Sequence, residues 1–286
     1  MYTARAADSK YNTAAQIISN DWGRDTVKKL AATALAGICV IGAMSLALTA
    51  ATAQTAEVKE KPAMYTYVGN WTIPRGKWAD MDKDTAASNK TLQHDLASGT
   101  LVGYGDDTNL VHTPDGATQD GWWSATSLAG VLDVLAEFYS SGSAASPVLQ
   151  SATKHWDNVY VSRFYNWRAG NYKGAYTLEA VYKLKADAPV DAVEMLSKNL
   201  IVPVCEKLLA EGAVVEYEID EQAIHTDSPD LFYIVYITPN AAGLDRANAV
   251  IREFLHGNPT AGPAFASMVD FGPHRDYLFR SNVVYK

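Results

Sequence analysis

The chain has 286 residues, of which 48% are apolar and 20% charged, and its formal net charge is −8. This composition is typical of a folded globular protein and excludes a disordered or collagen-like chain. The length suggests two domains of ordinary size. The acidic balance argues against a nucleic-acid partner, which would require a basic surface.

The first element along the chain is an uncharged segment that runs from Leu30 to Ala53 and follows Lys28 and Lys29. A basic start, an apolar centre and a small-residue end are typical of a secretory signal peptide, with cleavage expected near Ala53. An uncleaved anchor is the alternative, since about 20 apolar residues can span a bilayer. We therefore interpret residues 1–53 as an N-terminal extension and signal peptide. The protein is predicted to be exported, periplasmic or secreted, without membrane contact after cleavage.

The part that follows residue 53 holds 19 Lys and Arg against 29 Asp and Glu, and one cysteine, Cys205. A single cysteine can form no internal disulfide, even in an oxidising compartment. We interpret Cys205 as a small buried apolar residue on a helix.

Two stretches of this part repeat one another. LASGTLVGYGDDTNLVHT at 96–113 and LAEGAVVEYEIDEQAIHT at 209–226 are identical at 8 of 18 positions. The correspondence continues upstream, where YTYVGNWTI faces YTLEAVYKL, and downstream, where VLAEF faces VIREF. The sequence thus indicates an internal duplication with repeats at about 64–167 and 175–286.

Each repeat predicts the same order of elements. Residues 65–73 alternate in polarity with a period of two, as a half-buried strand does. A helical stretch follows, which Gly99 ends in the first repeat and Gly212 in the second. A strand, a loop with a His-Thr pair, a third strand, a second helix and a last strand complete the order. This βαββαβ order is the ferredoxin-like unit. One unit leaves a sheet face uncovered, so two copies are expected to pack sheet on sheet.

Because of this order of elements and the duplication, residues 64–286 resemble the dimeric α/β-barrel superfamily in its fused tandem form. The segment WWSATSLAGVLDVL resembles part of antibiotic-biosynthesis-monooxygenase-like and stress-responsive barrels. The resemblance implies an α+β fold, with two tandem ferredoxin-like repeats forming a pseudo-dimeric α/β barrel, and a monomer. Members of that superfamily include cofactor-free oxygenases, isomerases of small lactones, haem-binding enzymes and proteins without known activity. The fold therefore does not decide the function.

Histidines at matching positions of the repeats are the first candidates for chemistry. His112 and His225 each precede an acidic residue, so a proton-transfer base or a haem or metal ligand is one interpretation, and a structural role the other. His155 and His274 begin His-x-Asp triplets, where a local hydrogen bond with the Asp is the simplest role. A metal site needs three or four ligands, which the sequence does not supply, so no metal is predicted.

Polar and aromatic residues on the expected strands are the candidates for ligand binding. If the uncovered sheet faces form a lumen, a few polar groups would orient a ligand in an otherwise apolar pocket; the alternative is that they pair or face water. Aromatic residues of the first repeat would line a site for a flat ligand, or belong to the core. The predicted ligand-binding residues are Asn70, Trp71, Trp122, Trp123, Arg163, Glu179 and Arg280.

The sequence therefore predicts an exported barrel that binds a small aromatic or apolar compound in its N-terminal half. A cofactor-free oxygenase or isomerase with His112 or His225 as the base is the first hypothesis. A non-catalytic carrier and a haem-binding barrel are the alternatives, and whether the protein is an enzyme stays open. The sequence predicts no cofactor, with haem as the one alternative.

Overall fold

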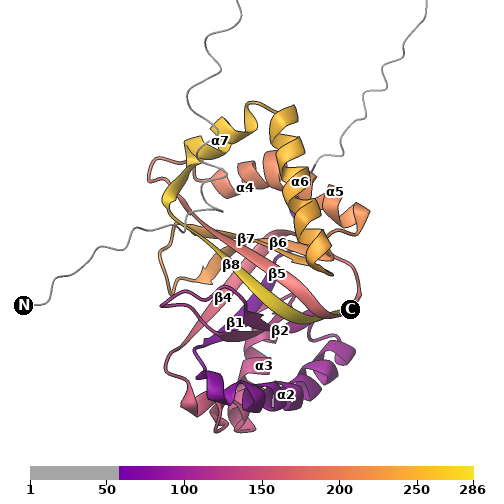
Figure 1. Ribbon diagram of the computed structural model, residues 1–286, viewed down its shortest axis with the longest axis vertical. Helices are drawn as coiled ribbons and strands as arrows, with labels where there is room; N and C mark the ends of the chain where they lie inside the picture. Colours follow the sequence, from indigo (N-terminus) through magenta and orange to yellow (C-terminus); the bar gives the residue numbers. More distant parts are fainter. Residues whose placement is uncertain (1–57) are drawn as a thin grey trace, which may run out of the picture. The chain divides into compact units, whose positions relative to one another are not determined.

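The computed structural model describes residues 58–286, and the expected signal peptide lies outside the described residues. Eight strands form one closed barrel in the order β1-β3-β2-β8-β5-β7-β6-β4, and all neighbouring strands are antiparallel (Figure 1). The strands are β1 (Met64–Trp71), β2 (Gly103–Asn109), β3 (Gln119–Ala125), β4 (His155–Trp167), β5 (Gly170–Leu184), β6 (Glu216–Ile224), β7 (Leu231–Thr238) and β8 (Val269–Tyr285).

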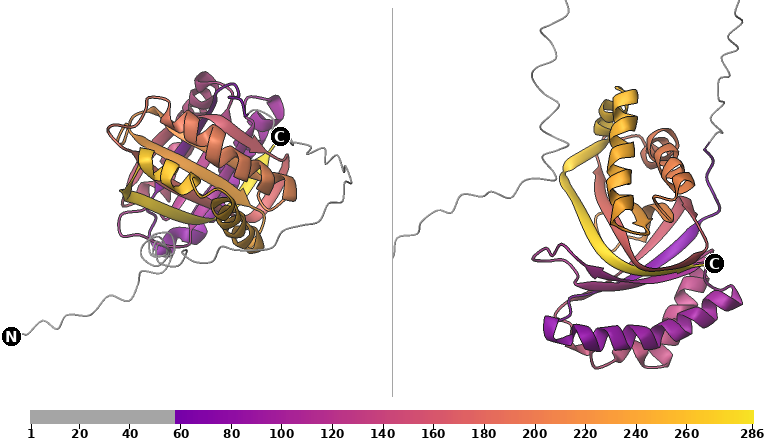
Figure 2. Two further views of the ribbon diagram at one scale, coloured as in Figure 1. Left: turned by 90° about the horizontal axis from the view of Figure 1, so that it is seen from above. Right: turned by 45° about the vertical axis from the view of Figure 1, so that its right-hand side comes forward.

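Helices cover the barrel on two opposite sides (Figures 1 and 2). On one side lie α2 (Trp78–Ser98) and α3 (Leu128–Ser140), and on the other α4 (Ala192–Leu196), α5 (Val202–Glu211), α6 (Ala241–Gly257) and α7 (Ala261–Met268). The predicted α+β class and the barrel are thus confirmed. Among residues 58–286, no helix is both long and apolar enough to cross a membrane.

The barrel closes differently from the expected stacking of two sheets. Strands β4-β1-β3-β2 and β8-β5-β7-β6 are two consecutive sets of neighbours, and they join edge to edge where β2 pairs with β8 and β4 with β6. Among residues 58–286, closure of the barrel leaves each strand paired on both sides. The long strand β8 bends along the wall and pairs with both β2 and β5, as Figure 2 shows in yellow. The faces that do not contact helices therefore surround a common lumen.

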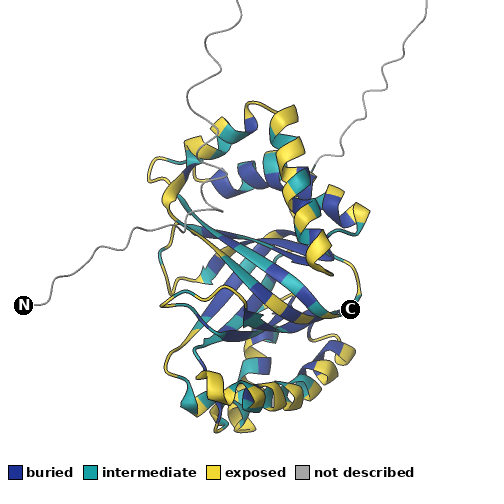
Figure 3. Ribbon diagram, in the orientation of Figure 1, coloured by how far each residue is buried: buried dark blue, intermediate teal, exposed yellow. Residues whose placement is uncertain are grey.

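Alternation along the strands separates the lumen from the core. On β1, Tyr67 packs outward in an apolar cluster with Trp123, while Thr66 and Val68 line the lumen. Adjacent residues of a strand point to opposite faces, so Trp122 lies in the lumen wall next to the outward Trp123. The outward faces of the strands and the helix faces that pack on them are buried, whereas the outer faces of the helices are exposed (Figure 3).

Local signals place the helix ends as predicted. Gly99 ends α2 with φ 88° and Gly212 ends α5 with φ 73°, both left-handed conformations that favour glycine. The helical stretch before Gly212 is not continuous, because a π turn over residues 197–201 precedes Pro203, which has no N–H to donate. Cys205 is 5% exposed within the apolar cluster under these helices. Burial, with the charge of Glu216, raises the pKa of its thiol to about 12, consistent with the predicted packing role.

Candidate functional site

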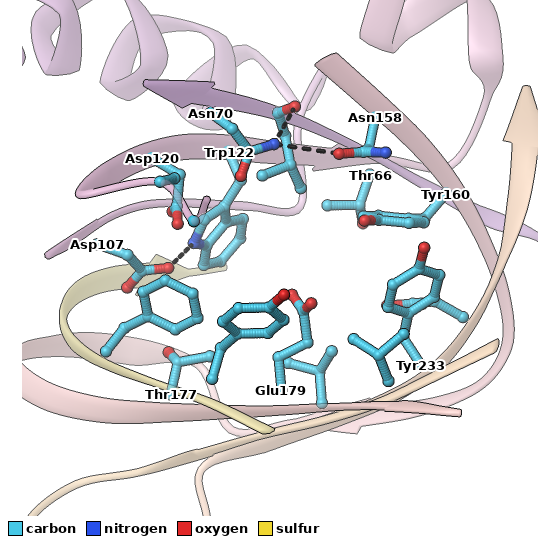
Figure 4. Close-up of a pocket in the computed structure, with 18 of the residues that line it drawn as sticks. Thr66, Asn70, Asp107, Asp120, Trp122, Asn158, Tyr160, Thr177, Glu179 and Tyr233 are labelled. Carbon is cyan, nitrogen blue, oxygen red and sulfur yellow. Dashed lines mark hydrogen bonds between the residues drawn. The ribbon is translucent and has the colours of Figure 1, made fainter. Parts of the chain in front are cut away.

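A cavity of about 190 Å³ occupies the lumen, and all eight strands contribute to its wall. We expected a site in the N-terminal half alone. The cavity is instead shared by both halves, because closure of the barrel turns both sets of strands toward one space. Figure 4 shows the side chains that point into it. Its wall combines acids, amides, hydroxyls and rings, so it is not the mainly apolar pocket that we expected.

The cavity wall is acidic. Five carboxyl side chains on the strands line it, and two more come from the loops after β2 and β6. Among the residues that line it, within the described part of the chain, there is no Lys, Arg or His. The acids are Asp107, Asp115, Asp120, Glu179, Glu218, Asp220 and Asp227.

Two of these acids occupy equivalent places in the barrel. Asp107 on β2 lies directly opposite Ser281 on β8, and Asp220 on β6 lies opposite Ser162 on β4. The Ser162 hydroxyl donates a hydrogen bond to Asp220. The Ser281 hydroxyl lies 2.7 Å from that of Thr177 and lowers the pKa of the facing Asp107. These contacts lie at the two seams where the strand sets join. Both aspartates are the Asp that the two similar stretches share, so the sequence comparison contained a signal for them that our candidate list missed.

Burial without nearby positive charge raises the pKa of the five acids on the strands. Burial, together with the charges of Asp107 and Glu218, raises the pKa of Glu179 to about 7. Burial also raises the pKa of Glu218 to about 7, although hydrogen bonds from Ser162 and Thr66 oppose the shift, and that of Asp107 to about 6. Carboxyl groups that titrate close to the working pH can both accept and donate protons, as acid–base catalysis requires.

Several carboxylate oxygens in this region have no hydrogen-bond partner within the protein. Asp107 and Asp120, which lie directly opposite each other on β2 and β3, are each 5% exposed, and Oδ1 of each is unpaired. The other oxygen of Asp107 accepts a 3.1 Å hydrogen bond from Trp122 Nε1. Buried acceptors without partners are costly to a folded protein and are concentrated at sites of function. Both residues line the cavity, so their carboxyl groups are the candidates to pair with a donor of a bound molecule.

Aromatic and amide groups complete the wall (Figure 4). The rings of Tyr160 and Tyr233 lie 4.7 Å apart, with planes tilted by 56°. Asn70 Nδ2 donates to Asn158 Oδ1 at 3.1 Å, which fixes both amides at one side of the cavity. The lumen thus offers rings, amides and carboxyls to one small ligand.

The structure brings three of the predicted ligand-binding residues together in this cavity: Asn70, Trp122 and Glu179. Trp71 and Trp123 instead lie on the helix-facing side of the sheet, beside a second cavity of about 100 Å³ under α2 and α3. Trp123 packs between Tyr67 and Phe138, with ring centroids 4.3 and 5.3 Å away.

Arg163 and Arg280 lie on the outside of the barrel. Arg163 is exposed, and its Nη1 lies 4.0 Å from Glu221 Oε2. Arg280 is exposed, and its Nη1 donates to the hydroxyl of Tyr176 at 2.5 Å. Each has a neighbour on the outer surface, the alternative that the sequence left open. Whether such a side chain faces the lumen or the outer surface depends on the exact register of its strand, because neighbouring positions on a strand face opposite sides.

The predicted catalytic histidines lie outside the cavity wall. His112 is exposed in the loop between β2 and β3, where its ring stacks on Trp78 at 5.8 Å, and His225 is exposed in the loop between β6 and β7. Loop acids beside them, Asp115 and Asp227, do line the cavity. The histidines therefore flank one end of the lumen without entering it.

The His-x-Asp triplets have the predicted local role. Nε2 of His155 lies 3.4 Å from Asp157, and its Nδ1 is 2.9 Å from the carbonyl oxygen of Asn70. His274 repeats this arrangement with Asp276 at 3.4 Å and the Val181 carbonyl at 2.9 Å. His155 thereby anchors the start of β4 to β1, and His274, which lies within β8, anchors that strand to β5.

Comparison with known proteins identifies the fold. No family model matches the chain, and no curated protein sequence does. Among solved structures, a protein assigned as a monooxygenase from Fusobacterium nucleatum aligns with a TM-score of 0.60 at 10% identity, over 79% of this chain and 95% of that one. One assigned as a monooxygenase from Lactobacillus acidophilus aligns with a TM-score of 0.55 at 12% identity, over 78% and 96%. The chain thus has the dimeric α/β-barrel fold that the sequence resembled. At these identities the likeness extends to the fold alone.

Proposed function

We propose that this protein is a small-molecule enzyme of the cofactor-free oxygenase or isomerase type, with the lumen as its active site. One observation carries the proposal: Glu179, Glu218 and Asp107, with pKa values of about 6 to 7, surround a cavity of ligand size. The likeness to proteins assigned as monooxygenases agrees with this class.

The chemistry would be proton transfer on a bound molecule. Glu179, when ionised, would accept a proton from an acidic C–H or O–H bond of the ligand. A protonated neighbour, Glu218 or Asp107, would donate a hydrogen bond to the oxygen that gains negative charge, and could return a proton at another position. Removal and return of one proton completes an isomerisation. An oxygenation would add dioxygen to the same deprotonated ligand.

Haem, which the sequence left as an alternative, does not fit this lumen. Haem iron is held by His, Cys, Met or Tyr. Of these, only Tyr160, Tyr233 and Tyr277 line the cavity, and burial raises the pKa of each, which opposes the ionised form that binds iron. A cavity of about 190 Å³ is also far smaller than a porphyrin. We derive no step through this cofactor.

Hydrogen–deuterium exchange into small carbon acids tests the proposed proton transfer. A panel of aryl ketones, unsaturated lactones and amino ketones would be incubated with the full-length protein in D₂O and followed by NMR. We expect accelerated exchange for at least one compound, and a loss of about a hundredfold in Glu179→Gln, since a general base contributes at least that much.

Glu221→Gln is the matched control, because Glu221 lies on β6 beside Asp220 but faces outward, with its side chain 49% exposed. It should retain the wild-type rate. An exchange rate that equals that of buffer, or one that Glu179→Gln leaves intact, would contradict the proposed enzyme. Binding in the lumen without exchange would instead support the carrier alternative.

Replacing the loop histidines tests our first assignment of the base. Because His112 and His225 are exposed and outside the cavity wall, His112→Ala and His225→Ala should each change the exchange rate by less than about twofold and the free energy of unfolding by about 0.5 kcal/mol or less. A hundredfold loss of exchange in either variant would show that the replaced histidine is the catalytic base and that Glu179 is not.

We also propose that residues 64–167 and 175–286 are copies of one ancestral unit, and that the exported protein acts as a monomer. The equivalent seams of Asp107 with Ser281 and Asp220 with Ser162 support the duplication. Closure of the barrel within one chain supports the monomer, since it leaves no open sheet edge for a partner. Cell fractionation and analytical ultracentrifugation would test export and oligomeric state.

A further inference from the structure

We propose that the lumen site selects a small organic cation, an ammonium group attached to a compact aromatic or branched apolar body. This inference rests on the proposed function, because it names the class of molecule for the same cavity. Three features of the wall lead to it: its uncompensated acids, its unpaired oxygens and its rings.

Charge is the first feature. Seven acidic side chains line the cavity, and no basic side chain among the described residues accompanies them. Arg163 on β4 and Arg280 on β8 face away from the lumen. On the outer surface, Arg163 lies near Glu221 and Arg280 contacts Tyr176. A buried carboxylate is costly unless a cation or hydrogen-bond donors pair with it. Protonation relieves this cost at low pH; above the raised pKa values of these acids, a bound cation would supply the positive charge that the wall lacks, and an anion would be repelled.

The unpaired oxygens are the second feature. Oδ1 of Asp107 and Oδ1 of Asp120 belong to residues that face each other across β2 and β3. Within the described residues no amide, hydroxyl or basic group donates to either oxygen, and the two carboxyl groups contact each other. An ammonium group carries up to three N–H donors and no acceptor, which suits a pair of carboxylates. Glu179 on the facing wall contributes a third carboxyl group, whose pKa the charge of Asp107 helps to raise.

The rings and the size of the cavity are the third feature. Trp122, Tyr160, Tyr233 and Phe279 line the same space, and aromatic faces attract cations within about 6 Å. A cavity of about 150 Å³ is known to accept benzene, so this one, at about 190 Å³, has room for a ring with a short amino arm. A metal ion is a poorer match, because no group of three or more His, Cys, Asp or Glu side chains within residues 58–286 is arranged to hold one.

Three probes that differ mainly in charge test the inference: benzylamine, benzyl alcohol and benzoate. Their binding to the full-length protein would be measured at pH 8 by calorimetry and by tryptophan fluorescence, to which Trp122 and Trp156 of the cavity wall contribute. We expect benzylamine to bind at least about tenfold more tightly than benzyl alcohol, and benzoate not to bind. Asp107→Asn and Asp120→Asn should each weaken benzylamine about tenfold and leave benzyl alcohol unchanged, while Glu221→Gln should change neither.

A variant that fills the lumen tests the ligand site separately from the preference for cations. Val235 lies between Glu179 and Glu218 in the strand register and lines the cavity, so Val235→Phe should abolish binding of any lumen ligand. If benzyl alcohol binds as tightly as benzylamine and Val235→Phe abolishes both, the lumen is a ligand site but the preference for cations is wrong. If no probe binds, or Val235→Phe has no effect on binding, both the ligand site and the cation preference are overturned.

Discussion

Glu179→Gln should make the protein more stable at pH 8, by about 1 to 3 kcal/mol, and should flatten its pH dependence. The Glu179 carboxyl has a pKa of about 7 in the folded chain, because of burial and of the charges of Asp107 and Glu218. In an unfolded chain the pKa of Glu is about 4.3. Between these values the folded protein holds a proton that the unfolded chain releases.

The sign follows from this difference in bound protons. Where the folded state binds more protons, stability falls as pH rises. The contribution of Glu179 is therefore most favourable below about pH 4, and it declines until pH 7 is passed. Asp107 and Glu218, whose pKa values burial also raises, to about 6 and about 7, act in the same direction. The wild type should thus unfold more readily at pH 8 than at pH 5.

Urea denaturation at pH 5, 6.5 and 8 measures the effect. Glu137→Gln is the control, because Glu137 is exposed on α3 and should leave the pH profile unchanged. A wild-type stability that rises from pH 5 to pH 8 would contradict the uncompensated lumen, as would a Glu179→Gln variant that is less stable than the wild type at pH 8.

Trp123→Ala should destabilise the protein by about 3 to 5 kcal/mol and leave binding in the lumen unchanged. Trp123 is 5% exposed and stacks on Tyr67 and Phe138, and its Nε1 donates to the Val131 carbonyl at 3.1 Å. Its removal would leave a cavity between β3 and α3 and would remove the hydrogen bond to the Val131 carbonyl. This change affects the helix-facing core, on the other side of the sheet from the lumen.

Thermal and chemical unfolding would measure this loss, with Tyr139→Ala as the control. Tyr139 is an aromatic residue of α3 that is 62% exposed, so its loss should cost about 0.5 kcal/mol or less. If Trp123→Ala were as stable as the wild type but bound lumen ligands weakly, Trp123 would belong to the site as the sequence first suggested.

The ligand site was only partly predictable from the sequence, and the reason differs from one residue to the next. Glu179 and Asn70 were found because each stands opposite the aromatic face of its strand. Trp122 and Trp123 could not be told apart from sequence, since which of two neighbours faces inward depends on the register of β3. Asp107 and Asp220 carried a detectable signal, because they are identical in both stretches, but histidines at matching positions drew the assignment away from them.

The order of the strands and of the helices other than α7, the glycine helix ends and the local role of the His-x-Asp triplets were determined by the sequence itself. Periodicity, capping and short-range hydrogen bonds act within a few residues. The helix α7 was expected as an irregular connection. Closure of the barrel through β2 with β8 and β4 with β6, and the gathering of seven acids around one cavity, were decided only by the tertiary structure. Residues as distant as Asp107 and Ser281 meet only when strands from the two ends of the chain pair. The pKa values of these acids depend on that burial, and so does the chemistry we propose.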